Sequence, residues 1–363
     1  MKIIAVIGTR PNMMKLAPVL AAAKPYPELS FLVVHTGQHY DHRMSDVFLE
    51  DLELPPPDVF LEIGSGSHAT QTARIMTALE TVMLEEQPDM VLVFGDVNST
   101  LAATLVAAKL CLPVAHVESG MRSFDRSMPE EINRIVTDHL SQLLFATSGV
   151  AVQNLIKEGI PRDRIHLVGD VMVDSLLTCL PRALDRPGYL DRFGLAPGGY
   201  GLVTVHRVDN VDIPGHLDEI VRLLAAVSRA LPLVLPLHPR TAKRLEEFGL
   251  RGRFREVPSI HIIDPVGYLD MLKLMKESRL VLTDSGGLQI ETSVLDIPCL
   301  TLRNTTERPE TLSLGTNRLL HRNLETALKA VDQVLNGGWP AVKPVTLWDG
   351  KAAERIINVL LAL

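Results

Sequence analysis

The stretch LVLTDSGGLQIETSVLDIPCLTL, Leu280 to Leu302, contains a strand, a turn, a helix and a second strand in close succession. The apolar run Leu280–Leu282 ends abruptly in Asp-Ser-Gly-Gly, and a helical pattern follows that carries Glu291 on its first turns. A second apolar run, Cys299–Leu302, comes next. Short runs that are apolar on both faces are typical of strands in a parallel sheet covered by helices. This unit therefore indicates an α/β fold.

The same alternation of short apolar runs and helical patterns extends over nearly the whole chain. In the first half, the predicted strands are Ile3–Ile7, Phe31–Val34, Met90–Phe94, Val114–Val117, Leu143–Ala146 and Ile165–Val168. In the second half, they are Gly201–Val205, Leu233–Leu237, His261–Ile263, Leu280–Leu282 and Cys299–Leu302. Helical patterns lie between them, for example Asn98–Cys111, Glu130–Gln142, Leu217–Leu231 and Leu269–Lys276. Strand–helix alternation of this kind predicts a doubly wound α/β fold.

The length of the chain predicts two domains, because 363 residues exceed what one typical core accommodates. Residues 175–200 form a helical pattern followed by a Pro- and Gly-rich stretch, which is the best candidate for a linker. We assign residues 1–172 to an N-terminal and residues 173–350 to a C-terminal Rossmann-like domain. The last helix, residues 351–363, is expected to pack back on the first domain. The two domains are expected to face each other across a cleft.

The composition is that of an ordinary globular enzyme, with 46% hydrophobic and 22% charged residues. The net charge of -7 gives no indication of nucleic-acid binding. The 3 cysteines form no CxxC pair, which fits a reducing compartment. The short apolar N-terminus is interpreted as a strand rather than a signal peptide, and no apolar run is long enough to cross a bilayer. We therefore expect a cytoplasmic protein that binds neither nucleic acid nor membrane.

Charged or phosphate-compatible residues follow nearly every predicted strand. Ligands of open α/β sheets bind at the carboxyl ends of the strands, so these residues are candidates for a shared site. In the first half they include Arg10, Lys15, Asp96 and Glu118, and Glu130 begins the next helical pattern. In the second half they include His206, His238, Ser285, Gly286, Gly287 and Arg308.

Each of these residues also has a simpler structural interpretation. Asp96 could cap the helix that starts near Asn98, and Glu130 lies in a Pro-Glu-Glu helix start, where acids favour the dipole. Glu118 could form an ordinary salt bridge, and the two histidines could be buried in the core. The Gly-Gly pair could form a tight turn, or it could let the backbone approach an anion at a helix N-terminus. Their common position at strand ends favours function.

Several cofactor classes are not supported by the sequence. The first strand is followed by Gly8-Thr9-Arg10-Pro11 rather than by GxGxxG, and no GxxxxGK[ST] occurs, so a dinucleotide oxidoreductase or a P-loop enzyme is not indicated. The spacing of His35 and His39 from other ligand types does not indicate a metal, and no HExxH occurs. We predict neither a cofactor nor a metal ion.

The combined motifs resemble those of the non-hydrolysing UDP-N-acetylglucosamine 2-epimerases. In the first half they are GTRPNMMKLAPV (8–19), TGQHYD (36–41), GDVNSTLA (95–102) and HVESGMRSFDRSMPEEINR (116–134). In the second half they are VTVHRVDN (203–210), HPRT (238–241), DSGGLQIE (284–291) and RNTTERPET (303–311). They follow the order of that family and cover almost the whole chain. The resemblance implies a glycosyltransferase-B-like fold and a homodimer.

The resemblance also implies roles for single residues. Asp96, Glu118, Glu130 and His206 are similar to the family's catalytic cluster. Arg10, Lys15, His238 and Arg308 are similar to ligands of the UDP-sugar, and Ser285, Gly286 and Gly287 to its diphosphate-binding loop. Glu291 is similar to the carboxylate that binds the ribose hydroxyls. Gln38 and His39 persist from the loop at which some members bind a second nucleotide-sugar as an activator.

The reaction implied is the reversible epimerisation of UDP-N-acetylglucosamine at C2 to UDP-N-acetylmannosamine, which supplies ManNAc units for surface polysaccharide. It proceeds by elimination of UDP to 2-acetamidoglucal and re-addition, so it needs acid–base groups near C2 and a cationic grip on UDP. Four alternatives stay open: a 2-epimerase of a modified UDP-sugar such as a 2,3-diacetamido uronic acid, a glycosyltransferase on the same fold, a hydrolysing relative, and a nucleotide-sugar sensor.

Overall fold

The computed structural model describes residues 1–363 apart from 39–41, 188, 189, 191–193, 256 and 258. The described residues form two compact units. Unit 1 comprises Met1–Cys179 together with Thr346–Leu363, and unit 2 comprises Leu180–Val345. Both the boundary expected from the sequence, between residues 172 and 173, and the boundary between the units fall inside one helix, α7 (Val171–Leu184).

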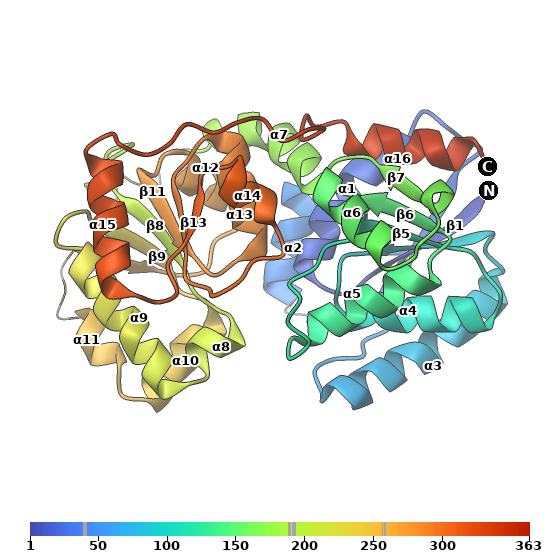
Figure 1. Ribbon diagram of the computed structural model, residues 1–363. Coiled ribbons are helices and arrows are strands. Elements are labelled where there is room, and N and C mark those ends of the chain that lie inside the picture. The colour runs from blue at the N-terminus through green and yellow to red at the C-terminus, as the bar shows by residue number, and fades with distance from the viewer. Residues whose placement is uncertain (39–41, 188–189, 191–193, 256, 258) are drawn as a thin grey trace. The chain divides into compact units, whose positions relative to one another are not determined.

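Unit 1 contains a parallel sheet in the order β3-β2-β1-β4-β5-β6-β7 (Figure 1). Its strands are β1 (Lys2–Ile7), β2 (Ser30–His35), β3 (Val59–Phe60), β4 (Met90–Phe94), β5 (Val114–Ser119), β6 (Leu143–Ala146) and β7 (Ile165–Leu167). Its helices, besides α7, are α1 (Arg10–Ala23), α2 (His42–Asp51), α3 (His68–Glu86), α4 (Asn98–Lys109), α5 (Pro129–Leu140), α6 (Gly149–Lys157) and α16 (Ala352–Leu361).

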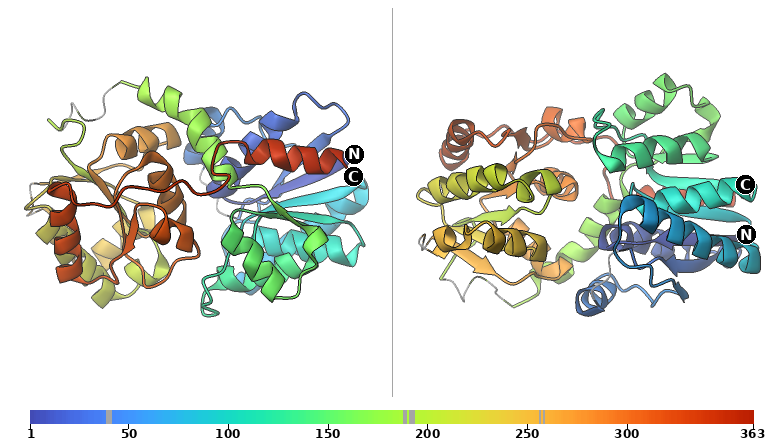
Figure 2. Two further views of the ribbon diagram at one scale, coloured as in Figure 1. Left: turned by 45° about the horizontal axis from the view of Figure 1, so that its top comes forward. Right: turned by 90° about the horizontal axis from the view of Figure 1, so that it is seen from below.

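Unit 2 contains a second parallel sheet in the order β10-β9-β8-β11-β12-β13. Its strands are β8 (Gly201–Thr204), β9 (Leu233–Pro236), β10 (Ile260–Ile263), β11 (Leu280–Thr283), β12 (Cys299–Thr301) and β13 (Asn317–Leu319). Its helices are α8 (Val208–Val211), α9 (Pro214–Val227), α10 (Pro239–Glu247), α11 (Arg251–Arg255), α12 (Tyr268–Lys276), α13 (Gly286–Leu295), α14 (Pro309–Ser313) and α15 (Leu324–Leu335). In both units, helices flank the sheet on its two faces (Figure 2).

Every strand predicted from the sequence is present, and the α/β fold with two Rossmann-like units is confirmed. The prediction missed β3 and β13. Both are short strands at an edge of their sheet: β3 has only two residues, Val59 and Phe60, and β13 is Asn-Arg-Leu, which is not an apolar run.

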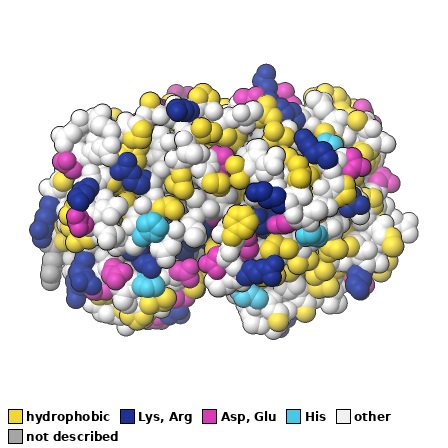
Figure 3. Space-filling view, viewed as in Figure 1, with side chains coloured by type: hydrophobic (Ala, Val, Ile, Leu, Met, Phe, Trp, Pro, Cys, Tyr) yellow, Lys and Arg dark blue, Asp and Glu magenta, His cyan; other side chains and the backbone are white. Residues whose placement is uncertain are grey.

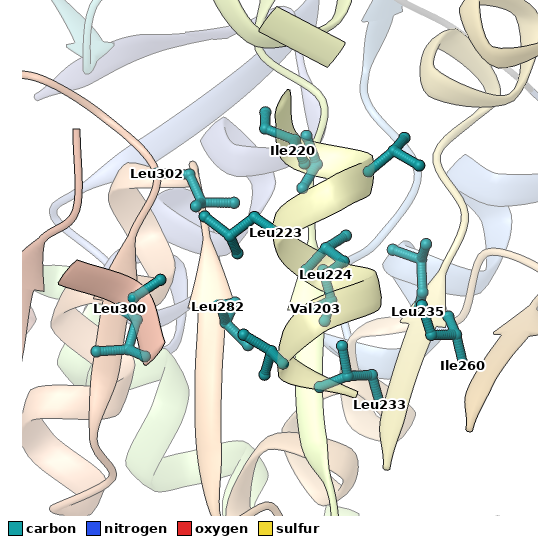
Figure 4. Close-up of a cluster of buried hydrophobic side chains, with 14 of the residues drawn as sticks. Val203, Ile220, Leu223, Leu224, Leu233, Leu235, Ile260, Leu282, Leu300 and Leu302 are labelled. Atoms are coloured by element: carbon teal, nitrogen blue, oxygen red, sulfur yellow. The ribbon is translucent and has the colours of Figure 1, made fainter. Parts of the chain in front are cut away.

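The core of unit 2 lies between α9 and the sheet (Figure 4). Leu223 and Leu224 of α9 are buried against side chains of β8, β9 and β11, among them Val203, Leu235 and Leu282. Burying a side chain of this size stabilises the fold by about 1.5–3 kcal/mol. This packing fixes the strands, and with them the positions of the residues that follow their carboxyl ends.

The direction of winding reverses once in each sheet. In unit 1 the reversal lies between β1 and β4, and in unit 2 between β8 and β11. At such a switch point the connections leave to opposite sides, which opens a crevice at the carboxyl ends of the two central strands. The residues there are Thr9, Arg10, Gly95 and Asp96 in unit 1, and His206, Arg207, Asp284 and Ser285 in unit 2.

The C-terminal helix α16 belongs to unit 1 and contacts α1 (Figure 1). Asp174 of α7 attaches its start, because the carboxylate accepts hydrogen bonds from the amides of Ala352 at 3.2 Å and Ala353 at 2.8 Å. These amides lack partners inside their own helix, so Asp174 caps a helix that is distant in the sequence. Burial raises the pKa of Asp174 to about 6, against the opposing effect of these two hydrogen bonds.

Asp174 should make the stability of the protein depend on pH between about 4 and 6. A raised pKa in the folded state means that this group's contribution to stability is complete below the unfolded pKa of about 4 and is lost as the pH rises to about 6. We therefore expect the free energy of unfolding of Asp174→Asn, relative to that of the wild type, to increase by up to about 3 kcal/mol from pH 4 to pH 7. Urea denaturation at several pH values measures this. Asp185→Asn, at an exposed position just beyond α7, is the control, and parallel pH curves for Asp174→Asn and wild type would contradict the assignment.

Candidate functional site

The turn after β1 is organised by Asn12, which is buried on the first turn of α1. Its side-chain oxygen accepts from the amides of Gly8 at 3.1 Å and Thr9 at 3.2 Å, and its Nδ2 donates to the carbonyl of Phe94 at 3.0 Å. An acid at this position could accept from the turn, but it could not donate to Phe94. Asn12 therefore ties the end of β1 to the end of β4, the two strands of the switch point.

Lys15 and Glu118 form a buried ion pair at the same strand ends. Gly95 provides the space for it: a Cβ at this residue would lie 2.6 Å from Lys15 Nζ and 2.9 Å from Glu118 Oε2. Gly95 also has a φ of +64°, which glycine adopts without strain. The structure thus brings two of the predicted site residues into direct contact, and a cation compensates the charge of this carboxylate.

The backbone of Glu118 is itself in an unusual conformation. Its φ is +74°, and the pairing of β5 with β6 shifts register between Val117 and Ser119. A bulge turns a side chain away from the alternation of its strand, and a left-handed residue with a side chain costs conformational energy. Such strain persists where the surrounding structure imposes it, and it is frequent at functional sites.

A buried ionic network fixes this bulge. His116 of β5 lies between Asp138 of α5, at 2.7 Å from its Nδ1, and the carbonyl of Gly95, at 2.8 Å from its Nε2. Asp138 also accepts from the amide of Gly120 at 3.1 Å and pairs with Arg122 at 2.8 Å. Burial acts to raise the pKa of Asp138, but His116 and Arg122 keep it below its ordinary value. The sequence motifs did not indicate this network, because His116 stands within a longer polar motif and Asp138 lies in a helix with several other polar residues.

Asp96 directly follows Gly95 and is held by Arg134 of α5. Arg134 contacts Asp96 Oδ2 through Nε at 2.9 Å and through Nη2 at 2.7 Å. The same guanidinium contacts Glu131 at 2.6 Å. The Asp96 side chain remains 28% exposed, so it is positioned by the protein and still accessible from solvent.

Glu130 and Glu131 begin α5 but have different environments. Glu131 is buried and accepts from the amides of Ser123 and Phe124, each at 2.9 Å, which makes it a structural residue of the preceding loop. Glu130 is partly exposed, and no described residue forms a hydrogen bond or an ion pair with its side chain. Of the two adjacent carboxylates, Glu130 is therefore the one available to a ligand.

Arg10 and Gln38 of unit 1 contact different helices. The Arg10 guanidinium stacks over the ring of Phe48 in α2 at 5.5 Å. The Gln38 side chain accepts from the amide and the hydroxyl of Ser99, at 3.0 and 2.8 Å, and thereby caps the start of α4. His39, which was singled out with Gln38, lies outside the described residues.

In unit 2, Asp284 organises the switch point. This buried carboxylate follows β11 and accepts from the amides of His206, at 3.0 Å, and Arg207, at 2.9 Å, which follow β8. It also accepts from the Asn210 side chain at 3.0 Å. Burial acts to raise its pKa, but the charge and hydrogen bonds of His206, with those of Asn210 and Arg207, lower it to about 2. Asp284 belongs to one of the sequence motifs, but the motif predicted no role for it.

Asp284 also orients the ring of His206, since Nδ1 lies 3.2 Å from Oδ1 of Asp284. A carboxylate at Nδ1 fixes the ring and leaves Nε2 to exchange a proton with a ligand. The His206 side chain is 39% exposed. The ring of His238 lies 5.4 Å from it, and Nδ1 of His238 accepts from the amide of Arg240 at the start of α10. The structure therefore brings the two predicted histidines together.

The start of α13 has the features of an anion site. Ser285 is the N-cap residue of α13, but its side chain forms no capping hydrogen bond. It therefore offers no acceptor to the amides of the first turn, which lack partners within the helix. A Cβ at Gly286 would lie 2.5 Å from Oε1 of Glu307, a buried carboxylate that pairs with Arg303 at 2.7 Å and with Arg207 at 3.6 Å. The close approach of Glu307 is one physical reason for glycine at this position.

Glu291 and Arg308 are both buried in unit 2. Glu291 accepts from the hydroxyl of Tyr268, the first residue of α12, at 2.9 Å. Arg308 precedes α14 as its N-cap residue. Burial and a defined hydrogen bond give Glu291 a fixed orientation, as a residue that recognises a ligand requires.

On the face shown in Figure 3, acidic and basic side chains are interspersed rather than gathered into one basic area. None of the described helices has the length and apolar character needed to cross a bilayer. Among the described residues, no group of three His, Cys, Asp or Glu side chains is placed to hold a metal ion.

Comparison with known families gives a match over most of the chain. The family model for UDP-N-acetylglucosamine 2-epimerase matches residues 21–361. The UDP-N-acetylglucosamine 2-epimerase of Methanocaldococcus jannaschii is 43% identical and is aligned over 99% of both chains. The UDP-2,3-diacetamido-2,3-dideoxy-D-glucuronate 2-epimerase of Pseudomonas aeruginosa is 45% identical over 88% of both chains.

Solved structures give the same result. The crystal structure of the Methanocaldococcus jannaschii UDP-GlcNAc 2-epimerase in complex with UDP-GlcNAc and UDP is similar over the whole of both chains, with a TM-score of 0.94 and 43% identity. The Neisseria meningitidis UDP-GlcNAc 2-epimerase bound to UDP-GlcNAc has a TM-score of 0.90 and 30% identity over the whole of both chains. The expected glycosyltransferase-B-like fold is thereby confirmed.

Asp284 should contribute to stability in a pH-dependent way. Because its pKa is lowered to about 2, its contribution is present above the unfolded value near 4 and is lost as the pH falls towards 2. We expect Asp284→Asn to lower the free energy of unfolding by about 2 kcal/mol at pH 7, and the difference from the wild type to shrink below pH 4. Urea denaturation at pH 7, 4 and 3 measures this, with Asp332→Asn on the exposed side of α15 as control. A deficit that is unchanged at pH 3 would show that the carboxylate's charge is not the cause.

Proposed function

The chain belongs to the UDP-N-acetylglucosamine 2-epimerase family, and we propose that it interconverts UDP-N-acetylglucosamine and UDP-N-acetylmannosamine. The observation that supports this most strongly is the group of carboxylates at the switch point of unit 1, together with the anion-binding helix start at the switch point of unit 2. An epimerase of this kind needs both, because the nucleotide has to leave while a carbon-bound proton is moved.

We propose that residues 1–172 with 351–363 supply the groups that act on the sugar, and that residues 173–350 supply those that bind UDP. In this assignment Asp96, Glu118 and Glu130 transfer protons. Lys15 compensates the charge of Glu118, and Arg134 that of Asp96. Arg10 contributes a further cation for the substrate.

The proposed reaction has two balanced steps. A carboxylate removes the proton from C2, the C1–O bond breaks, and UDP departs with the bonding electron pair, which leaves the C1=C2 double bond of 2-acetamidoglucal. UDP then attacks C1, and a carboxylic acid delivers a proton to C2 from the opposite face. Direct abstraction to a free C2 anion is avoided, since no carbonyl is adjacent to that carbon to stabilise the charge.

We assign the binding of UDP to residues of unit 2. The amides at the start of α13, Ser285 to Gly287, are directed at the diphosphate, and Arg308 adds a positive charge. His206, oriented by Asp284, donates its Nε2 proton to the departing phosphate oxygen, and His238 lies beside it. Glu291 binds the ribose hydroxyls. These groups stabilise UDP as a leaving group, which is the electrostatic part of catalysis.

A second candidate substrate is a UDP-2,3-diacetamido uronic acid. The 45% identity to the Pseudomonas aeruginosa enzyme named for such a substrate favours it. The chemistry at C1 and C2 is the same, so the proton-transfer residues do not distinguish the two substrates. We place UDP-N-acetylglucosamine first because the match to its epimerases covers nearly the entire chain.

We also propose that the active form is a homodimer and that its product supplies ManNAc units for a surface polysaccharide. Both proposals rest on the resemblance to the family. Light scattering on the purified chain measures the mass, and a monomer at micromolar concentration would rule out the dimer.

Incubation with a single UDP-sugar in D2O tests the function. We expect UDP-N-acetylglucosamine alone to yield UDP-N-acetylmannosamine with deuterium at C2, because the proton added at C2 comes from a group that exchanges with solvent. NMR measures both the product and the deuterium. Release of free ManNAc would show hydrolysis instead. If only the diacetamido uronic acid substrate reacts, the second candidate is correct, and if a bound UDP-sugar reacts only with an acceptor, the chain is a glycosyltransferase.

Glu118→Gln should abolish this exchange. Loss of a general acid–base group lowers kcat by about 10²- to 10⁴-fold. The amide also leaves the Lys15 ammonium without its carboxylate, so Lys15→Met/Glu118→Gln serves as a second variant with no unpaired buried charge. We expect Glu118→Gln to bind UDP within about threefold of wild type by calorimetry, because Glu118 is assigned to proton transfer and not to the binding of UDP.

The matched control is Glu325→Gln on the exposed surface of α15, where the carboxylate pairs with Lys329 at 2.6 Å. It should leave kcat unchanged. A large loss of UDP affinity in both Glu118 variants would instead make Glu118 a ligand or a structural residue.

A further inference from the structure

The loop of residues 120–128 joins the two ends of the proposed carboxylate cluster. It begins directly after β5, where Glu118 lies, and ends at α5, whose first turn contains Glu130. Phe124 is at its centre and has the largest exposure among the large hydrophobic side chains of the described residues, 77%. A single exposed apolar side chain is ordinary in itself, but the backbone that carries this one is unusual.

The backbone of Phe124 is held in a conformation that disfavours a bulky side chain. Its φ is +58°, in the left-handed region, where the Cβ approaches the following carbonyl group. Glycine would adopt this conformation without strain. The ring gains little from packing in return, because most of its surface is in contact with solvent. This position is therefore unfavourable for phenylalanine for two reasons, the backbone strain and the exposure of the ring to solvent.

The surrounding loop is rigid rather than loosely arranged. Glu131 accepts from the amide of Phe124 at 2.9 Å and from the amide and hydroxyl of Ser123 at 2.9 and 3.0 Å. Asp125 accepts from the amide of Ser127 at 3.0 Å and from its hydroxyl at 2.6 Å. The loop is thus fixed on both sides of Phe124, and the strain is imposed by the structure.

A short chain of contacts connects Phe124 to the proposed catalytic groups. Glu131, which binds its amide, is also bound by Arg134, and Arg134 holds Asp96. An aromatic side chain on the loop that links Glu118 to Glu130 fits the apolar face of a pyranose ring or the methyl group of an acetamido substituent. Polar groups alone do not recognise these parts of a sugar.

We propose that Phe124 contacts the sugar of the UDP-sugar and positions its C2 for proton transfer, which makes it a specificity-determining residue. This inference rests on the proposed function. The occupant of the surface around Phe124 is the N-acetylhexosamine moiety, and UDP itself is not in contact with the ring. The strain and the exposure are retained because the ring becomes covered when the substrate binds.

Substitution by glycine separates function from stability. Phe124→Gly removes the strain, so the melting temperature should stay unchanged or rise slightly, although the extra freedom of glycine in the unfolded chain offsets part of this gain. The KM for UDP-N-acetylglucosamine should rise about tenfold, the scale of one lost aromatic contact, while the affinity for UDP by calorimetry stays within about twofold. Phe124→Tyr keeps the ring and should retain nearly the wild-type KM, and Phe124→Leu should lie between them.

The control is Leu84→Ala, which removes another exposed apolar side chain of unit 1, on α3, 57% exposed. It should change neither KM nor kcat. An unchanged KM in Phe124→Gly overturns the inference, and so does a parallel loss of melting temperature and activity, which would make the role structural. If light scattering shows that Phe124→Gly differs from the wild type in molecular mass, a second copy of the chain covers Phe124, and this result would also overturn the inference. A wild-type chain that does not convert UDP-N-acetylglucosamine overturns the proposed function instead, irrespective of Phe124.

Discussion

The site depends on one topological constraint, the reversal of winding in each parallel sheet. Because neighbouring parallel strands end at the same edge, the residues after β1 and β4, and those after β8 and β11, are brought together whatever their separation in the sequence. The apolar packing of helices on the sheets fixes these strand ends, and Asn12 and Asp284 join them across the reversal by hydrogen bonds to backbone groups. The polar constellation is therefore a consequence of strand order, with a buried side chain bridging the two strands in each unit.

The charges at these strand ends are balanced locally. Lys15 with Glu118, Arg134 with Asp96 and His206 with Asp284 are each a cationic or protonatable group paired with a carboxylate. Buried pairs of this kind add little net stability compared with apolar packing, since desolvation opposes the Coulombic attraction. Their value for an epimerase lies in orientation. A group that must receive and return a proton is held in one geometry, and its partner limits the electrostatic change when the proton moves.

The sequence was sufficient to predict the fold and to propose a location for the site, because both inferences depend on local patterns. Apolar runs identified the covered strands, and the polar residues after them made Asp96, Glu118 and His206 candidates for the site. The partners of these residues were not accessible in the same way. Lys15 and Glu118 are separated by 103 positions, and His206 and Asp284 by 78. Such pairs can be predicted only once the strand order is known. The edge strands β3 and β13 were missed because β3 has only two residues and β13 is not an apolar run.

Two of the left-handed non-glycine residues of unit 1 lie near the proposed proton-transfer groups. Glu118, near the end of β5, has a φ of +74°, and Phe124, in the connection from β5 to α5, has a φ of +58°. Both are fixed by buried carboxylates of α5: Asp138 binds the amide of Gly120 and the guanidinium of Arg122, and Glu131 binds the amides of Ser123 and Phe124. Helix α5 thus acts as a template that imposes an unfavourable backbone on a loop. A protein under selection for stability alone would relax such positions to glycine. Retention of a carboxylate and an aromatic ring at these two positions is the expected outcome where the substrate, rather than the core, is what they contact.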